Sequence, residues 1–198
     1  MKSPNKVDVA VYQQPKHGYR SCGDSYYYIE KENEFVCALA DGLGSGEFAR
    51  ESSQVVVDII RDHIDASVEE LLTICTKQLL GKRGAVLGIL KIDFKAKTYT
   101  YSSIGNIGIM TITEDKKKKR NIPNAGYLTG YSRPFKVMQG KLEESMNFIM
   151  FSDGVSDTDL MYPFLLNMDV HDVIHSYEKA VRLPRKDDTT LIAMRYEA

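Results

Sequence analysis

The sequence is poor in cysteine, in long apolar runs and in excess charge of either sign. Its three cysteines, an odd number without a Cys-x-x-Cys pair, argue against a disulfide framework or a cysteine-based zinc site. No apolar run approaches the roughly 18–20 residues that cross a bilayer, and the first residues carry no apolar signal core. With a net charge of −1, the chain has no overall positive charge that would attract a polyanion such as a nucleic acid. These absences predict a cytoplasmic protein that binds neither membrane nor nucleic acid.

The order of the predicted elements favours an α+β fold. Alternating valines over 7–11 indicate a strand with one buried face. Two consecutive helices are expected, one over 46–65 and one that begins at Ser67 with a capping-box pattern. Strand-like stretches dominate the rest, with one shorter helix before a final strand at 189–196. Because strands and helices do not alternate strictly, we expect largely antiparallel sheets covered by helices, in a single domain over 1–198.

Five aspartates lie at the ends of predicted core strands. They are Asp24, Asp41, Asp153, Asp187 and Asp188. Strand ends are rigid, so they can place side chains accurately. If the sheets bring these ends together, the carboxylates repel one another unless cations lie between them. All-oxygen ligands select hard ions such as Mg²⁺ or Mn²⁺, so the pattern indicates a site for those ions.

Taken singly, each of these motifs is weak. An Asp-Gly pair, such as Asp41-Gly42 or Asp153-Gly154, is most often only a turn. The glycines of GLGSG, at 42–46, have neither the spacing of a dinucleotide-binding fingerprint nor the Gly-Lys-Ser/Thr ending of a Walker A loop. The ordered set of motifs therefore carries more information than any one of them.

A basic run and a pair of histidines are weaker indications of function. The basic run at 116–120 is interpreted as a solvated hairpin turn, with an electrostatic contact to an acidic partner as the alternative. His171 and His175 lie one helical turn apart, but no glutamate follows the first of them as a zinc-protease helix requires. We interpret the two histidines as a pair on a helix surface.

The ordered motifs resemble those of the metal-dependent protein phosphatase (phosphatase 2C) superfamily, in particular its compact bacterial branch related to SpoIIE and RsbU. The matching stretches are GDS at 23–25, ADGLGSG at 40–46, GN at 105–106, FSDG at 151–154 and DDTT at 187–190. They occur in the family's order and span most of the chain.

This resemblance implies a four-layer α-β-β-α sandwich of two largely antiparallel sheets flanked by helices, with a metal centre at one end. It implies two Mn²⁺ or Mg²⁺ ions, bridged by Asp41, with the backbone carbonyl of Gly42 binding one of them. Asp153 and Asp187 would complete the protein ligands of the second ion. Asp24 would act through bound water.

Three positions depart from the family pattern or match it loosely. Asp188 stands beside a ligand where many relatives have asparagine, and it is a further candidate metal ligand. Animal-type relatives have a Glu-Asp pair where this chain has Gly23-Asp24, which removes one acidic group. Arg20 matches the phosphate-contacting arginine of those relatives only in rough position, and a surface arginine is the alternative.

The residues support phosphoester hydrolysis without a protein nucleophile. Two metal ions roughly 3.5–4 Å apart activate a water and neutralise the phosphoryl oxygens. The resemblance implies a phosphoserine/phosphothreonine protein phosphatase that acts as a monomer. Its substrates would be phosphorylated STAS-domain proteins of a stressosome, RsbS and RsbR, and it would exert negative feedback on the general stress sigma factor. The alternatives are a phosphatase of a small phosphorylated metabolite and a non-catalytic binding module with the same fold.

Overall fold

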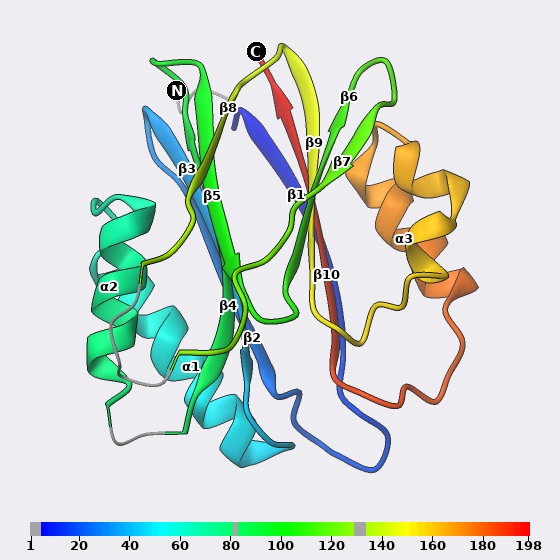
Figure 1. Ribbon diagram of the computed structural model, residues 1–198. Coiled ribbons are helices and arrows are strands. Elements are labelled where there is room, and N and C mark those ends of the chain that lie inside the picture. The colour runs from blue at the N-terminus through cyan, green and yellow to red at the C-terminus, as the bar shows by residue number, and fades with distance from the viewer. Residues whose placement is uncertain (1–4, 81–82, 129–133) are drawn as a thin grey trace.

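Two antiparallel sheets of five strands each form the centre of the molecule, and helices cover both outer faces (Figure 1). The computed structural model describes residues 5–80, 83–128 and 134–198. The first sheet has the order β1-β10-β9-β6-β7 and the second has the order β2-β3-β4-β5-β8. The expected α-β-β-α sandwich is thereby confirmed.

The strands of the first sheet are β1 (Val7–Gln14), β10 (Thr189–Glu197), β9 (Ser145–Phe151), β6 (Gly108–Thr113) and β7 (Lys118–Arg120). Those of the second sheet are β2 (Asp24–Glu30), β3 (Glu34–Gly42), β4 (Ala85–Asp93), β5 (Thr98–Ile104) and β8 (Met138–Lys141). The short edge strands β7 and β8 were not predicted from the sequence. β7 uses part of the basic run that we interpreted as a solvated turn, and all three of its residues are exposed.

Helices α1 (Glu47–Asp62) and α2 (Val68–Gln78) cover the second sheet, whereas α3 (Val170–Ala180) covers the first (Figure 1). Short 3₁₀ helices, η1 (Asp159–Met161) and η2 (Pro163–Leu166), precede α3. The predicted capping box is present, because Ser67 Oγ accepts from Glu70 N–H while the Glu70 carboxylate accepts from Ser67 N–H. None of the helices in the described ranges is long and apolar enough to cross a membrane.

Three apolar clusters fill the spaces between the four layers. Strand β3 contributes side chains to two of these clusters. Phe35, Cys37 and Leu39 pack between the sheets, whereas Ala38 and Ala40 face the helices α1 and α2. Side chains alternate between the two faces of a strand, so a strand buried on both faces reads as one continuous apolar run. The two small alanines let α1 approach the end of β3 closely.

Candidate metal centre

Asp24 and Asp41 lie directly opposite each other on the adjacent strands β2 and β3. Cross-strand partners of this kind place their side chains on the same face, with Cβ atoms about 4.5–5.5 Å apart. Asp24 is fully buried, and Asp41 is half-buried. The structure therefore brings together two of the predicted carboxylates at one end of the second sheet.

The Asp24 carboxylate also connects the two sheets. Its Oδ2 accepts hydrogen bonds from Ser152 Oγ at 2.7 Å and from Thr190 Oγ1 at 2.6 Å, and both donors belong to the first sheet or its immediate end. Its Oδ1 is buried and has no hydrogen-bond partner within the described part of the chain. A buried carboxylate oxygen left without a partner is costly unless water or a cation meets it. This oxygen is thus suited to hold a water beside a metal ion.

The aspartates raise one another's affinity for protons. Burial, followed by the charges of the other four aspartates, raises the pKa of Asp41 to about 8. Burial also raises the pKa of Asp24 to about 6, against the opposing effect of its two hydroxyl donors. The pKa of Asp153 is raised by burial and by Asp187. Crowded carboxylates of this kind favour bound cations, so the donor set fits hard metal ions.

Asp153 and Asp187 lie at the edge of this cluster and have other partners. Asn106 Nδ2 donates to Asp153 Oδ2 at 2.5 Å, and the N–H of Asp188 donates to Asp187 Oδ1 at 3.0 Å. Lys16 Nζ lies 3.9 Å from the same Asp187 oxygen. Among the described residues, no three Asp, Glu, His or Cys side chains stand as a preformed metal site. The carboxylates assigned to the second ion would therefore have to exchange these partners for the metal.

Asp188 has a structural partner, whereas Arg20 lies at the surface. The Asp188 Oδ1 accepts from the N–H of Lys16 at 2.9 Å, which ties the end of β10 to the loop before β2. A Cβ at Gly23 would lie 2.7 Å from Asp188 Oδ2 and 2.9 Å from Ala49 Cβ, so the glutamate of animal-type relatives has no room here. Arg20 is exposed in the same loop.

A glycine at position 42 lets helix α1 pack closely against the end of β3, apart from any metal ligation by its carbonyl. A Cβ at this position would lie 1.8 Å from the carbonyl oxygen of Ala49, in the first turns of α1. Because the obstructing atom belongs to the backbone, it cannot move aside as a flexible side chain could. The proposed metal ligation by the Gly42 carbonyl stays a prediction.

Replacing Gly42 by alanine should therefore lower the free energy of unfolding by about 1–3 kcal/mol, as overpacking does elsewhere. Chemical denaturation of the metal-free protein measures this change. The control is Ser45→Ala in the same loop, for which we expect a change within about 0.5 kcal/mol. Equal stability of Gly42→Ala and the unmodified protein would mean that α1 does not approach β3 as closely as described.

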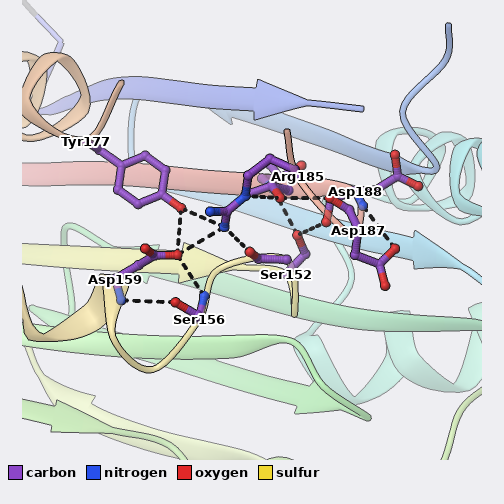
Figure 2. A network of polar contacts seen from close by, with 10 residues as sticks. Ser152, Ser156, Asp159, Tyr177, Arg185, Asp187 and Asp188 are labelled. Atoms are coloured by element: carbon purple, nitrogen blue, oxygen red, sulfur yellow. Dashed lines mark hydrogen bonds and ion pairs between the residues drawn. The ribbon is translucent and has the colours of Figure 1, made fainter. Parts of the chain in front are cut away.

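Arg185, which the sequence analysis missed, links the two loops that carry Asp153 and Asp187 (Figure 2). Its Nη2 donates to the carbonyl oxygen of Gly154, to Asp159 Oδ2 at 3.0 Å and to the Tyr177 hydroxyl at 3.4 Å. Its Nε donates to Thr189 Oγ1 at 3.1 Å. The side chains of Arg185 and Asp159 are only 10% and 9% exposed. The only signal in the sequence was the position of Arg185, two residues before Asp187.

Asn106 was quoted in the GN motif but received no role from the sequence. The structure places it against Asp153, where it donates the hydrogen bond described above. Loop 105–107 follows β5 and reaches the end of β9, so the contact joins segments more than 40 residues apart. Asn106 is thus a candidate for orienting a metal ligand.

Comparison with known proteins identifies the family. No protein-family model matches this chain. The phosphoserine phosphatase RsbX of Bacillus subtilis strain 168 is 33% identical over 186 residues, which cover 94% of this chain and 93% of that protein. A crystal structure of RsbX in complex with magnesium has a TM-score of 0.88 and 30% identity, over 99% of this chain and 98% of that one.

A more distant structure shares the fold. The phosphatase 2C domain of the cell fate determinant SpoIIE from Bacillus subtilis has a TM-score of 0.78 and 16% identity, over 96% of this chain and 63% of that one. The strand-end aspartates thus lie in a fold common to phosphatases of this type, and the match to RsbX extends over nearly the whole chain. The chain is a phosphatase, it shares the fold of the phosphatase 2C domain of SpoIIE, and it belongs to the family of the phosphoserine phosphatase RsbX.

Proposed function

We propose that the protein is a Mn²⁺- or Mg²⁺-dependent phosphatase of phosphoserine and phosphothreonine in proteins. The observation that carries this proposal is the cluster of aspartates gathered from the ends of both sheets, in which burial and then the charges of the neighbouring carboxylates raise the pKa of Asp41 to about 8. Cations would relieve that repulsion, and the ligands are all oxygen. The magnesium in the RsbX crystal structure supports the choice of ion.

The proposed ligands follow the family resemblance. Asp41 would bridge two ions, the Gly42 carbonyl would bind one of them, and Asp153 and Asp187 would complete the second. Asp24 would act through water, for which its unpartnered Oδ1 is available. When bound, the two ions would supply an activated water and neutralise charge on the phosphoryl oxygens.

The other residues of the centre would position these ligands. Ser152 and Thr190 fix Asp24 in one orientation through its Oδ2. Asn106 orients Asp153. Asp188 is occupied by the backbone of Lys16, which favours a structural role over direct ligation. For Arg20, an exposed position in the loop before β2 is compatible with a contact to the substrate phosphate.

For the substrate, we propose phosphorylated STAS-domain proteins of a stressosome, RsbS and RsbR, with negative feedback on the general stress sigma factor. This finer assignment rests on the resemblance to RsbX. The spacing of the motifs leaves no insertion large enough for a cap that would enclose a small metabolite. We also propose that the enzyme acts as a monomer. Its three cysteines are buried and free, which supports a reducing, cytoplasmic location.

Release of phosphate from a phosphoserine STAS-domain protein tests this function. We expect turnover with Mn²⁺ or Mg²⁺ and a loss to background with EDTA, restored when the metal is added back, because the aspartates cannot activate water by themselves. Free phosphoserine serves as the matched small substrate. Undiminished turnover under EDTA would contradict the metal mechanism, and equal efficiency on free phosphoserine would favour the small-metabolite alternative.

A further inference from the structure

Large apolar side chains are exposed around the loop that follows Asp41. Leu43 is 38% exposed and Phe48 is 64% exposed, although both lie within seven residues of that aspartate. Tyr19, 46% exposed, lies against the same loop, since a Cβ at Gly46 would come within 2.7 Å of its ring. Single exposed apolar residues are ordinary, but a group of them around one loop indicates an interaction surface.

Arg83 contacts this loop from the neighbouring strand segment. Its guanidinium carbon lies 5.0 Å from the centroid of the Phe48 ring, a cation–π arrangement. Its Nη1 would lie 3.4 Å from a Cβ placed on Gly44. The next residue, Gly84, accepts a hydrogen bond from the N–H of Leu43 at 3.1 Å. Arg83 and Phe48 are therefore held beside the backbone that carries Asp41.

A small hollow lies next to this pair. It has a volume of about 240 Å³ and is lined by Phe48, Glu51, Ser52, Val55 and Arg83. Pockets for small-molecule ligands usually measure about 300–1,000 Å³. The hollow is thus better matched to a single side chain of a partner protein than to a complete small ligand.

The exposed charges nearby favour a negatively charged partner segment. Arg20, Arg50 and Arg83 are exposed on this side of the metal centre, and Glu47 and Glu51 are the acidic residues of the same part of α1. These three arginines and two glutamates leave one excess positive charge on this surface. A phosphoserine carries about −1.5 to −2 charges near neutral pH, so the two are complementary in charge. Arginine and aromatic side chains are also the residue types that dominate binding energy at protein interfaces.

We propose that Tyr19, Leu43, Phe48 and Arg83 form a docking rim for the phosphoprotein substrate. An apolar side chain near the phosphoserine packs on Phe48 and enters the hollow, while the arginines of this side of the molecule face the negative charge of the segment. The occupant is a folded protein that presents phosphoserine next to an apolar residue. This inference rests on the proposed function and adds a recognition surface to it.

The test compares two substrates with the metal-loaded, full-length enzyme. For Phe48→Ala and for Arg83→Ala, we expect KM for a phosphoserine STAS-domain protein to rise about tenfold, the usual effect of losing an interface anchor. The kcat/KM for p-nitrophenyl phosphate should stay within about twofold, because that substrate is too small to reach the rim. Met161→Ala removes an apolar side chain that is 77% exposed beside the other sheet, and it should change neither value.

The outcomes separate the docking rim from the proposed function. Unchanged KM for the phosphoprotein in both variants overturns the docking rim, as does an equal loss on both substrates in variants whose melting temperatures match that of the unmodified enzyme. If the unmodified enzyme with metal hydrolyses neither substrate, the proposed function itself is contradicted. Arg83→Lys keeps the charge but loses the planar stacking, so a KM between those of the unmodified enzyme and Arg83→Ala supports the contact with Phe48.

Discussion

Asp41→Asn is expected to reduce turnover of a phosphoserine protein on the order of 10³-fold, as the removal of a principal electrostatic group does in other active sites. Asp41 lies opposite Asp24, and its carboxylate interacts with four other aspartates. Asparagine keeps the size and one oxygen of the side chain but removes the charge that would hold two cations. Steady-state phosphate release at saturating Mn²⁺ measures the effect, and turnover within tenfold of the unmodified enzyme would contradict the bridging role.

The same substitution should stabilise the metal-free protein. The pKa of Asp41 is about 8 in the folded chain, well above its ordinary value near 4, so the folded state holds a proton that the unfolded state releases. The stability that protonation of Asp41 contributes is therefore fully present below about pH 4 and is lost as the pH rises through 8. Asparagine does not ionise, so the advantage of Asp41→Asn should grow between pH 5 and pH 8.

Thermal unfolding in EDTA at several pH values measures this advantage. We expect an increase in melting temperature of about 2–4 °C for each kcal/mol gained. Added Mn²⁺ should reverse the order, because only the unmodified protein gains metal binding energy. A lower melting temperature of Asp41→Asn in EDTA at pH 8 would show that the aspartates do not repel one another in the folded state.

Arg185→Ala should have the largest effect on stability, a loss of about 3–5 kcal/mol, because it leaves the buried carboxylate of Asp159 without its cation. The substitution also removes the donor to the Gly154 carbonyl and to Thr189, so the loops of Asp153 and Asp187 lose their common support (Figure 2). Turnover should therefore fall together with stability.

Chemical denaturation of Arg185→Ala measures this loss. The matched control is Arg61→Ala, which breaks an exposed arginine–aspartate pair whose N–O distance is 2.9 Å, with side chains 49% and 40% exposed. Exposed pairs contribute about 0–1 kcal/mol, so Arg61→Ala should change little. A loss below about 1 kcal/mol for Arg185→Ala would mean that the buried pair does not hold the loops.

The pH dependence of Arg185→Ala provides a second readout. Burial acts to raise the pKa of Asp159, but hydrogen bonds from Ser156 and the pairing with Arg185 outweigh it, so the pKa lies below its ordinary value. The contribution of this carboxylate is thus present above about pH 4 and is lost as the pH falls through its lowered pKa. The stability deficit of Arg185→Ala should shrink between pH 7 and pH 3, and an equal deficit at both would contradict the ion-pair explanation.

Local patterns in the sequence predicted the strands, the helices and the positions of the aspartates at strand ends, whereas the four-layer sandwich with those ends at one site followed from the family resemblance. Alternation along β3 and the helical spacing of α1 define the buried faces, and the aspartates stand where those apolar patterns stop. Asp24 begins β2 as expected, and Asp41 lies next to the last residue of β3. The roles of these aspartates as metal ligands remain predictions.

The missed features depend on contacts between distant parts of the chain. Arg185 joins η1, α3 and two loops, and no local pattern distinguishes a buried arginine from an exposed one in a charged segment. The edge strand β7 forms because the backbone of Lys118–Arg120 pairs with Met110–Ile112, while its three basic side chains stay exposed to solvent. The packing role of Gly42 was also missed: the absence of a side chain at this position makes room for the backbone of Ala49 in α1.

Equilibrium binding of Mn²⁺ to the EDTA-stripped protein tests the central claim most directly, because it needs no substrate. The aspartate cluster predicts saturable binding of two ions per chain, and at most one weakly bound ion in Asp41→Asn, with Asp62→Asn on the far end of α1 as a control that still binds two. Absence of saturable binding in the unmodified protein, or two ions bound equally well by Asp41→Asn, would contradict the account.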